Sequence, residues 1–353
     1  MHFDRTTTNN FDCIRLLAAL AVFYSHQVKL MGRGVVEVSS YHDLGKTGVL
    51  VFFVMSGYLV AQSWERDPHL WRFLARRFLR IWPGLICVVL LTVFALGPLM
   101  TSLPVREYFQ SPQTMHYLGH ILLIIQERLP GVFTGHPIER VNGPLWTIPI
   151  EAGWYAVLAA IGVMGLLRYR FTMPFLLLAC AIYVFGIYGT ENQDVAPFWE
   201  LEFGLFFLHG ACLHYLRQWW LPRPWSAAAF VSVLAVLANA LGHEYIAILI
   251  ALPYFVILIA QASTPIARDA GRWGDFSYGI YIYSFPVQQT VVALSKNSLG
   301  LVEATVVSLG CAMLLAWLSW RFVEAPAIGL KRFLQPGMKS RNLENTAHAA
   351  TTT

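Results

Sequence analysis

The sequence has 353 residues, of which 56% are hydrophobic and only 13% are charged, with a formal net charge of +5. Soluble domains carry roughly 25% charged residues, so this composition excludes an ordinary soluble fold with a charged surface. The basic residues lie in short segments between apolar runs and build no basic soluble face, so nucleic acid is not an expected partner.

Apolar runs of about 17–23 residues recur along the chain, which is the length of helix that crosses ~30 Å of hydrocarbon. They predict an all-α membrane bundle of about ten transmembrane helices. The stretch 115–126 is apolar over too short a length to span, and we expect a re-entrant or interfacial helix there. We predict spans at residues 11–31, 47–64, 81–100, 145–167, 172–190, 199–216, 224–242, 245–260, 276–294 and 300–320.

The positions of Lys and Arg predict the orientation of the bundle. With the N-terminus in the cytoplasm, 18 of the 25 basic residues fall on the inside, and every short inside loop carries at least two. Cytoplasmic loops are enriched in Lys and Arg, so this bias predicts that both termini are cytoplasmic. We assign residues 1–10 to an N-terminal tail, 11–334 to the transmembrane domain and 335–353 to a polar, disordered tail.

The first predicted span contains three polar groups that are costly inside a membrane, Asp12, Arg15 and His26. Arg15 and His26 are eleven residues apart, so they project from one face of a helix, with His26 roughly 16 Å further along the axis. Asp12 falls on the same side. One interpretation is a catalytic set; the other is an interfacial ion pair with His26 as a packing residue.

The segment HLWRFLARRFLRIWPG, which we place in the loop between the second and third spans, is rich in arginine. Arg72, Arg76, Arg77 and Arg80 alternate with apolar residues and end at Pro83. The guanidinium group binds phosphate by paired hydrogen bonds, which favours a cytoplasmic polyphosphate site. An amphipathic segment held by anionic lipid headgroups fits the same pattern.

Acidic residues in two later spans add candidates. Glu151 in NGPLWTIPIEAGWY is either a catalytic carboxylate or a complement to the helix dipole. Glu202 and His209 are seven residues apart on one helix face, and we favour a structural pair.

The five cysteines form no CxxC pair, so they predict packing residues and no metal site.

Together these segments resemble the acyltransferase 3 family of membrane O-acyltransferases over roughly residues 11–330. Each motif is short, but they occur in the family's order on a scaffold of matching polarity. The matching residues are Arg15 and His26; Phe52, Phe53, Ser56, Gly57 and Tyr58; Arg77, Arg80, Ile81 and Pro83; Leu145, Trp146 and Glu151; and the late segments SYGIYIYSFPV and RFVEAP.

The resemblance implies an enzyme of the bacterial inner membrane with no permanently bound cofactor. It would move an acyl group, with acetyl favoured, from cytoplasmic acyl-CoA to a hydroxyl of a cell-envelope glycan or lipid-linked sugar. His26 would be the general base or acyl carrier, Glu151 would orient it, and Arg15 would pair with the CoA arm or hold Asp12. The acyl-CoA site would comprise Arg77, Arg80, Ser56 and Tyr58, with the Ser56–Gly57–Tyr58 turn allowing close helix approach.

One residue departs from the family pattern. Ser284 stands where the family often has a histidine, so no role of that histidine is carried over. Two other classes stay open at this point. An intramembrane relay of His, Arg and Glu also fits a secondary transporter or flippase, and the third class is a non-catalytic scaffold protein.

Overall fold

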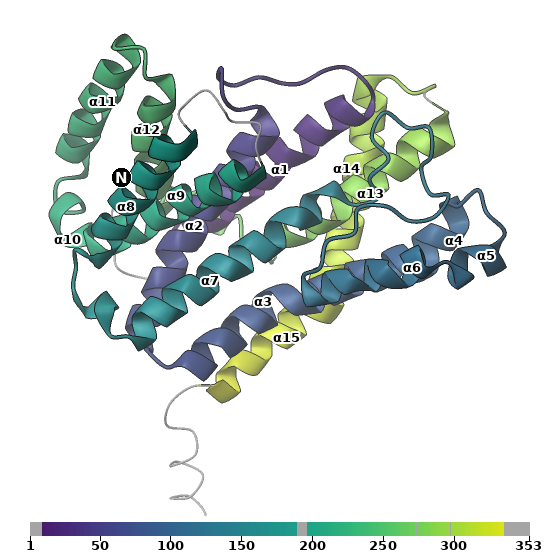
Figure 1. Ribbon diagram of the computed structural model, residues 1–353, viewed down its shortest axis with the longest axis horizontal. Coiled ribbons are helices and arrows are strands. Elements are labelled where there is room, and N and C mark those ends of the chain that lie inside the picture. Colours follow the sequence, from purple (N-terminus) through teal and green to yellow (C-terminus); the bar gives the residue numbers. More distant parts are fainter. Residues whose placement is uncertain (1–8, 189–195, 273, 297, 335–353) are drawn as a thin grey trace, which may run out of the picture.

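The computed structural model describes residues 9–188, 196–272, 274–296 and 298–334 (Figure 1). Within these ranges the regular structure is helical, apart from two isolated β-bridges, Glu37–Asp43 and Thr101–Val132. The predicted all-α class is therefore confirmed. The predicted C-terminal tail and residues 1–8 of the predicted N-terminal tail lie outside the described residues.

Each of the ten predicted spans coincides with a helix. The helices are α1 (Phe11–Leu30), α2 (Leu44–Arg66), α3 (Leu70–Leu91) running on through a π-helical turn into α4 (Gly97–Met100), α7 (Thr147–Val163), α8 (Thr172–Tyr188), α9 (Ala196–Tyr215), α11 (Pro224–Ala240), α12 (Glu244–Gln261), α13 (Ser277–Ser295) and α14 (Leu301–Ser319). Short helices lie between them, α5 (Val105–Gln110), α6 (Pro112–Tyr117) and α10 (Arg217–Trp220), and α15 (Ala325–Gly329) follows α14.

Six helices in the described part of the chain are long and apolar enough to cross a membrane. They are Phe11–Leu30, Leu44–Arg66, Leu70–Met100, Gly143–Val163, Glu244–Gln261 and Leu301–Leu334. Two more apolar helices, Thr172–Gly186 and Pro224–Ala240, are shorter. The segment 115–126 forms the end of α6 and a 3₁₀ turn at Leu118–Leu122, so it is too short to span, as predicted.

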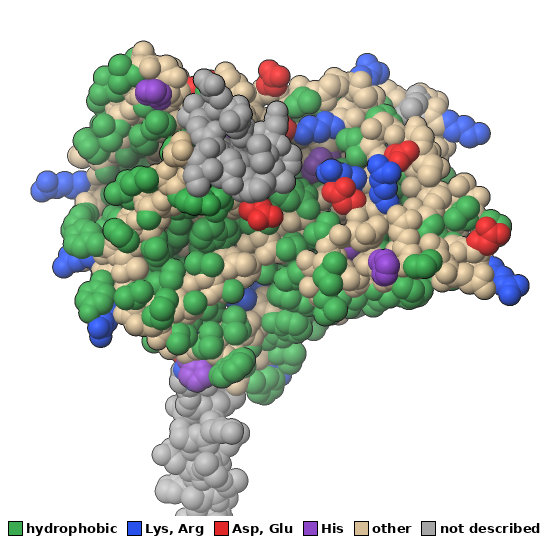
Figure 2. Space-filling model, in the orientation of Figure 1, with side chains coloured by type: hydrophobic (Ala, Val, Ile, Leu, Met, Phe, Trp, Pro, Cys, Tyr) green, Lys and Arg blue, Asp and Glu red, His purple; other side chains and the backbone are tan. Residues whose placement is uncertain are grey.

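The outer helices expose large apolar side chains, as expected of a surface that faces lipid. Val302 of α14, Phe175 of α8 and Val236 of α11 are 72%, 70% and 66% exposed. Figure 2 shows a broad hydrophobic area across the face in view, with charged side chains gathered along its edges. A soluble protein rarely exposes such a continuous apolar surface.

Helix α2 lies at the centre and packs against α1 and α9 (Figure 1). Glycine makes the approach to α9 possible, because a Cβ on Gly57 would overlap the carbonyl oxygen of Phe207. A Cβ on Gly210 would likewise overlap the carbonyl oxygen of Val54. The predicted close approach at Ser56–Gly57–Tyr58 is therefore confirmed, although these residues are continuous helix and not a turn.

The arginine-rich segment is also helical, which corrects its predicted position in a loop. Helix α3 begins at Leu70, capped by His69, and continues past Pro83, which lies inside the helix. The third predicted span therefore starts eleven residues too late. The four arginines suggested a loop, whereas they lie in the first turns of a helix that continues through Pro83.

The long connection from residue 123 to 142 folds back onto α13. Gln289 of α13 donates to the carbonyl oxygens of Ile138 (2.6 Å) and Arg140 (2.7 Å), and its Oε1 lies 2.8 Å from Nδ1 of His136. Asn142 Nδ2 donates to the carbonyl oxygen of Ile282, 2.8 Å away. The connection is thus anchored just before α7 begins.

Candidate active site

A cavity of about 90 Å³ lies inside the bundle, between α1, α2, α3, α7 and α13. Its polar lining brings together residues that are far apart in the sequence. Six of them carry the chemistry: Arg15, Ser56, Arg77, Arg80, Glu151 and Tyr155. Five of these were predicted as site residues, whereas Tyr155 was not.

Glu151 is the acceptor for two hydroxyl groups in this cavity. Ser56 Oγ on α2 donates to Oε1 of Glu151 at 2.5 Å, and the Tyr155 hydroxyl donates to the same oxygen. Ser56 Oγ and the Tyr155 hydroxyl are 3.3 Å apart. Tyr155 follows Glu151 by four residues, so both side chains leave α7 on one face. The three groups form a compact polar cluster deep in the bundle.

Two of the cavity's arginines are held by Asp275, which lies just before α13. Arg80 forms an ion pair with Asp275 Oδ2, and Arg15 Nη1 lies 3.3 Å from the same oxygen. Arg15 also pairs with Asp12 at 3.2 Å, which confirms the predicted contact within the first helix. Burial opposes ionisation of Asp275, but Arg80, Arg15 and hydrogen bonds from Ser277 outweigh it and hold the pKa of this carboxyl below its usual range.

Arg77 differs from its neighbours because it has no ion pair or hydrogen bond among the described residues. Its Nε is buried and unpartnered, and its guanidinium lies 6.0 Å and 5.9 Å from the ring centroids of Phe73 and Tyr155. Lys331, near the end of the described chain, lies within electrostatic range of Arg77 and the other cavity arginines. A buried cation that lacks a counter-ion is costly, and a bound anion would remove that cost.

Arg72 and Arg76 of the same segment both bind Asp67, just before α3 begins. Asp67 accepts from Arg72 Nη2 at 2.5 Å and from Arg76 Nη1 at 2.6 Å. Hydrogen bonds from Arg72, supported by Arg76, hold the pKa of Asp67 well below its usual range. Of the four arginines in this segment, the structure therefore leaves only Arg77 unpaired within the described residues.

His26 lies further along α1, where its ring packs edge-on against Phe285 of α13 with centroids 5.1 Å apart. Arg15 and His26 both face α13, which confirms that they share one side of α1. His26 is half-buried, and neither ring nitrogen is hydrogen-bonded to a described residue.

His26 and Glu151 occupy two levels of the bundle and do not touch. Phe285, which contacts His26, lies one helical turn beyond Tyr281, whose hydroxyl is 2.7 Å from Thr147 Oγ1. Thr147 in turn lies one turn before Glu151. Two turns of helix correspond to roughly 11 Å. The carboxylate therefore orients Ser56 and Tyr155, while the predicted direct pairing with His26 is not found.

Three further candidates lie outside this cavity. Tyr58 faces α9, where its ring packs against His214 at 5.1 Å. The predicted Glu202–His209 pair is wrong, because Glu202 instead contacts His42 (2.7 Å), Lys46 (2.8 Å) and Tyr245 (3.0 Å). These partners come from loops and helices that sequence spacing on α9 does not reveal.

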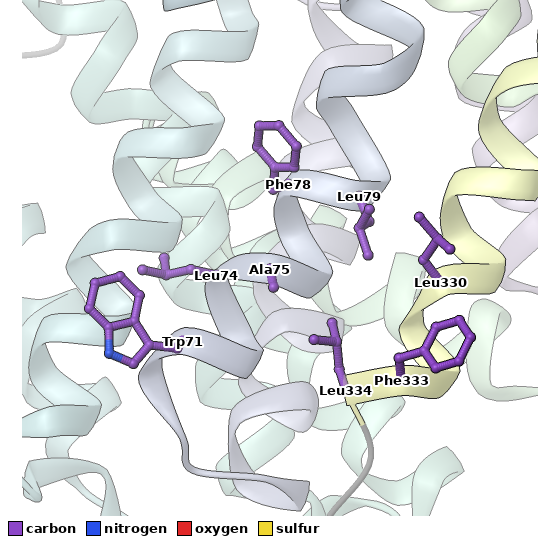
Figure 3. A pocket seen from close by; sticks show the side chains of 8 residues that line it. All are labelled: Trp71, Leu74, Ala75, Phe78, Leu79, Leu330, Phe333 and Leu334. Carbon is purple, nitrogen blue, oxygen red and sulfur yellow. The ribbon is translucent and has the colours of Figure 1, made fainter. Parts of the chain in front are cut away.

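A larger apolar groove of about 600 Å³ runs between α3 and the last described residues (Figure 3). Its lining contains no titratable side chain, so it supplies no chemistry for group transfer. The residues are Trp71, Leu74, Ala75, Phe78, Leu79, Leu330, Phe333 and Leu334.

Sequence reasoning missed Tyr155, Asp275 and Lys331. Tyr155 had a usable signal, since it follows Glu151 at the i+4 spacing that puts both on one helix face. Asp275 and Lys331 carried none, because only the folded bundle brings them beside α1 and α3.

Comparison with known proteins decides the family. A family model described as an acyltransferase domain matches residues 8–321. The chain belongs to this acyltransferase family. The acyltransferase is 31% identical to an O-acetyl transferase of Shigella phage Sf6, over 93% of this chain and 96% of the phage protein. No solved structure matches the chain.

Two other relatives share nearly all of the described bundle. Nodulation protein 10 of Rhizobium leguminosarum bv. viciae is 27% identical over 92% of this chain and 95% of its own. Peptidoglycan O-acetyltransferase OatA of Listeria monocytogenes is 24% identical over 92% of this chain and 56% of its own. The acyltransferase is therefore a multi-pass membrane O-acetyltransferase, and its family resemblance is confirmed.

Proposed function

We propose that the enzyme transfers an acetyl group from cytoplasmic acetyl-CoA to a hydroxyl of a cell-envelope glycan or lipid-linked sugar in a bacterial inner membrane. In this proposal the ten helices span the membrane and both termini are cytoplasmic, as the distribution of Lys and Arg favours. Two relatives are named as O-acetyltransferases, which supports the proposed class of reaction.

The observation that carries the donor assignment is the unpaired Arg77 in the polar cavity. CoA bears several phosphate charges, and a guanidinium is well suited to bind them. Lys331 adds a second positive charge near Arg77. Arg80 and Arg15 are neutralised by Asp275 and Asp12, so we assign them to holding the cavity wall in place.

From Arg77 the donor's arm would pass the Ser56–Glu151–Tyr155 cluster, whose hydroxyl and carboxylate oxygens suit the amides of pantetheine. Tyr281 and Phe285 continue the α13 wall as far as His26. Tyr58 faces α9, on another side of α2 from Ser56, so the donor site is proposed without it.

The His26 ring acts as general base in this scheme. One imidazole nitrogen removes the proton of the acceptor hydroxyl as its oxygen attacks the thioester carbonyl carbon. The new C–O bond forms, the C–S bond breaks, and the imidazolium returns the proton to the departing thiolate. The products are the O-acetyl ester and free CoA. Glu151 acts from the donor's path and does not touch the base.

The test uses purified protein in liposomes that contain the host's lipid-linked glycan, supplied with radiolabelled acetyl-CoA. The proposal expects one free CoA for each acetyl ester formed on the glycan. A transporter or flippase leaves the thioester intact. Absence of CoA release from acetyl-CoA by well-folded wild-type protein would contradict the proposed donor.

A further inference from the structure

Two buried amides near His26 have carbonyl oxygens with no partner. Asn142 is 2% exposed and Gln288 is fully buried, yet Asn142 Oδ1 and Gln288 Oε1 make no hydrogen bond. Buried polar atoms in folded proteins are nearly always satisfied, so each exception needs an explanation. A bound group that donates hydrogen bonds supplies one.

Both amides lie around the His26–Phe285 contact. Gln288 follows Phe285 by three residues and donates through Nε2 to the carbonyl oxygen of Phe23, one turn before His26, at 2.8 Å. Asn142 binds the carbonyl oxygen of Ile282, one turn before Phe285, and a Cβ on the adjoining Gly143 would lie 3.2 Å from the Phe285 ring. Along α13 the two amides are therefore anchored within one helical turn of Phe285, one on each side of it in the sequence.

The chemistry of the missing partner follows from how each amide is anchored. Both side-chain nitrogens donate to backbone carbonyl oxygens, which fixes the free atom of each amide as oxygen. Two such oxygens accept hydrogen bonds, and neither attracts an anion. The complementary ligand presents several O–H donors next to His26.

We propose that Asn142 and Gln288 bind hydroxyl groups of the acceptor, so that the site takes a polyhydroxylated, sugar-type molecule. This inference rests on the proposed function and deepens it by naming the acceptor subsite. Gln27 has two unpartnered amide atoms as well, but it is turned by about 100° from His26 on α1, so we leave it out of the subsite.

The experiment measures how the acetyl group is divided between glycan and water. Acetyl-CoA and an acceptor hydroxyl give ester and CoA, whereas acetyl-CoA and water give acetate and CoA. Asn142→Leu and Gln288→Met are placed in the glycan-containing liposomes with radiolabelled acetyl-CoA. Glycan ester and free acetate are counted, and CoA binding is measured separately.

We expect the ratio of ester to acetate to fall about tenfold or more in both variants, with unchanged affinity for CoA. Ser308→Ala is the matched control, since it removes an unpartnered buried hydroxyl on α14; its ratio should equal that of the wild type. Asn142→Ser and Gln288→Asn, which shorten each side chain, test the same atoms if the larger changes do not fold.

Two results would overturn the acceptor subsite while leaving the proposed function intact. One is a wild-type ratio in all folded variants; the other is a parallel fall of transfer and hydrolysis, which would assign the amides to the shared machinery. Wild-type protein that releases no CoA contradicts the proposed function itself, and this inference with it.

Discussion

Ser56 on α2 and Glu151 on α7 are joined by a hydrogen bond of 2.5 Å, although they are 95 positions apart in the chain. Tyr155 donates to the same carboxylate oxygen, and Arg77 lies over the Tyr155 ring. The contact ties the second and seventh helices together at the polar cavity. It also sets Glu151 about two helical turns from His26, so the two residues have separable effects on the reaction.

Substituting Glu151 tests this separation. Glu151→Gln keeps an oxygen for Ser56 but removes the charge, and we expect kcat to fall roughly tenfold because the donor's path is disturbed. The midpoint of the pH–rate profile should stay where it is in the wild type. A carboxylate that paired directly with the base would instead shift that midpoint to lower pH when neutralised. Steady-state rates from pH 5 to 9 distinguish the two arrangements.

Arg77 is predicted to dominate donor binding. Arg77→Ala removes a charge-assisted contact of about 1.5–3 kcal/mol, which corresponds to a roughly ten- to hundredfold higher KM for acetyl-CoA. Arg77→Lys should recover part of this, because lysine keeps the charge but lacks the planar fork. Arg332→Ala, which removes an exposed cation beside Lys331, should leave KM unchanged. Equal KM values for Arg77→Ala and wild type would contradict the donor site.

The Asp275 ion pairs give a prediction about pH and stability. Because the folded pKa of Asp275 is depressed, its contribution is complete above the unfolded pKa of about 3.9 and is lost only as the pH falls through the folded value. Asp275→Asn should cost about 3–5 kcal/mol, since Arg80 and Arg15 lose their shared partner.

That cost should be the same from pH 5 to pH 8 and should shrink only in acid. Thermal unfolding of both proteins in one detergent, repeated across this range, measures it. A difference in stability that disappears near pH 6 would show that another group carries the effect.

Sequence alone predicted the helical class, the helices at all ten predicted spans and five of the six chemical groups in the cavity. Periodicity and motif spacing are local signals, and they suffice for Arg15, Ser56, Arg77, Arg80 and Glu151. Which residue a charged side chain pairs with depends on the tertiary structure. Asp275 reaches Arg80 across 195 positions, so the sequence could not show that Arg80 is neutralised while Arg77 is free.

The helix start at Leu70 was missed for a different reason. The four arginines before Pro83 indicated a loop, because basic residues concentrate in the cytoplasmic loops of membrane proteins. In the structure Asp67 pairs with Arg72 and Arg76, and the helix forms from Leu70 onward.

Orientation in the membrane is testable with single cysteines in a cysteine-free background. Ser40 and His69 are both exposed, in the connections before and after α2. Ser40→Cys should react with a membrane-impermeant thiol reagent added to intact spheroplasts, and His69→Cys should react only after lysis. Labelling of His69→Cys alone in intact cells would show that the orientation is the reverse of the proposed one. The donor cavity would then open to the outer face of the membrane.

His26 is the base in the proposed transfer, and the matched change is His26→Gln. Glutamine keeps a hydrogen-bonding group of similar size beside Phe285 but cannot act as a base. We predict that glycan acetylation by this variant in liposomes falls by about 10²–10⁴, while CoA binding, set by Arg77 at the other level of the bundle, is retained. Acetylation at a near wild-type rate would contradict it.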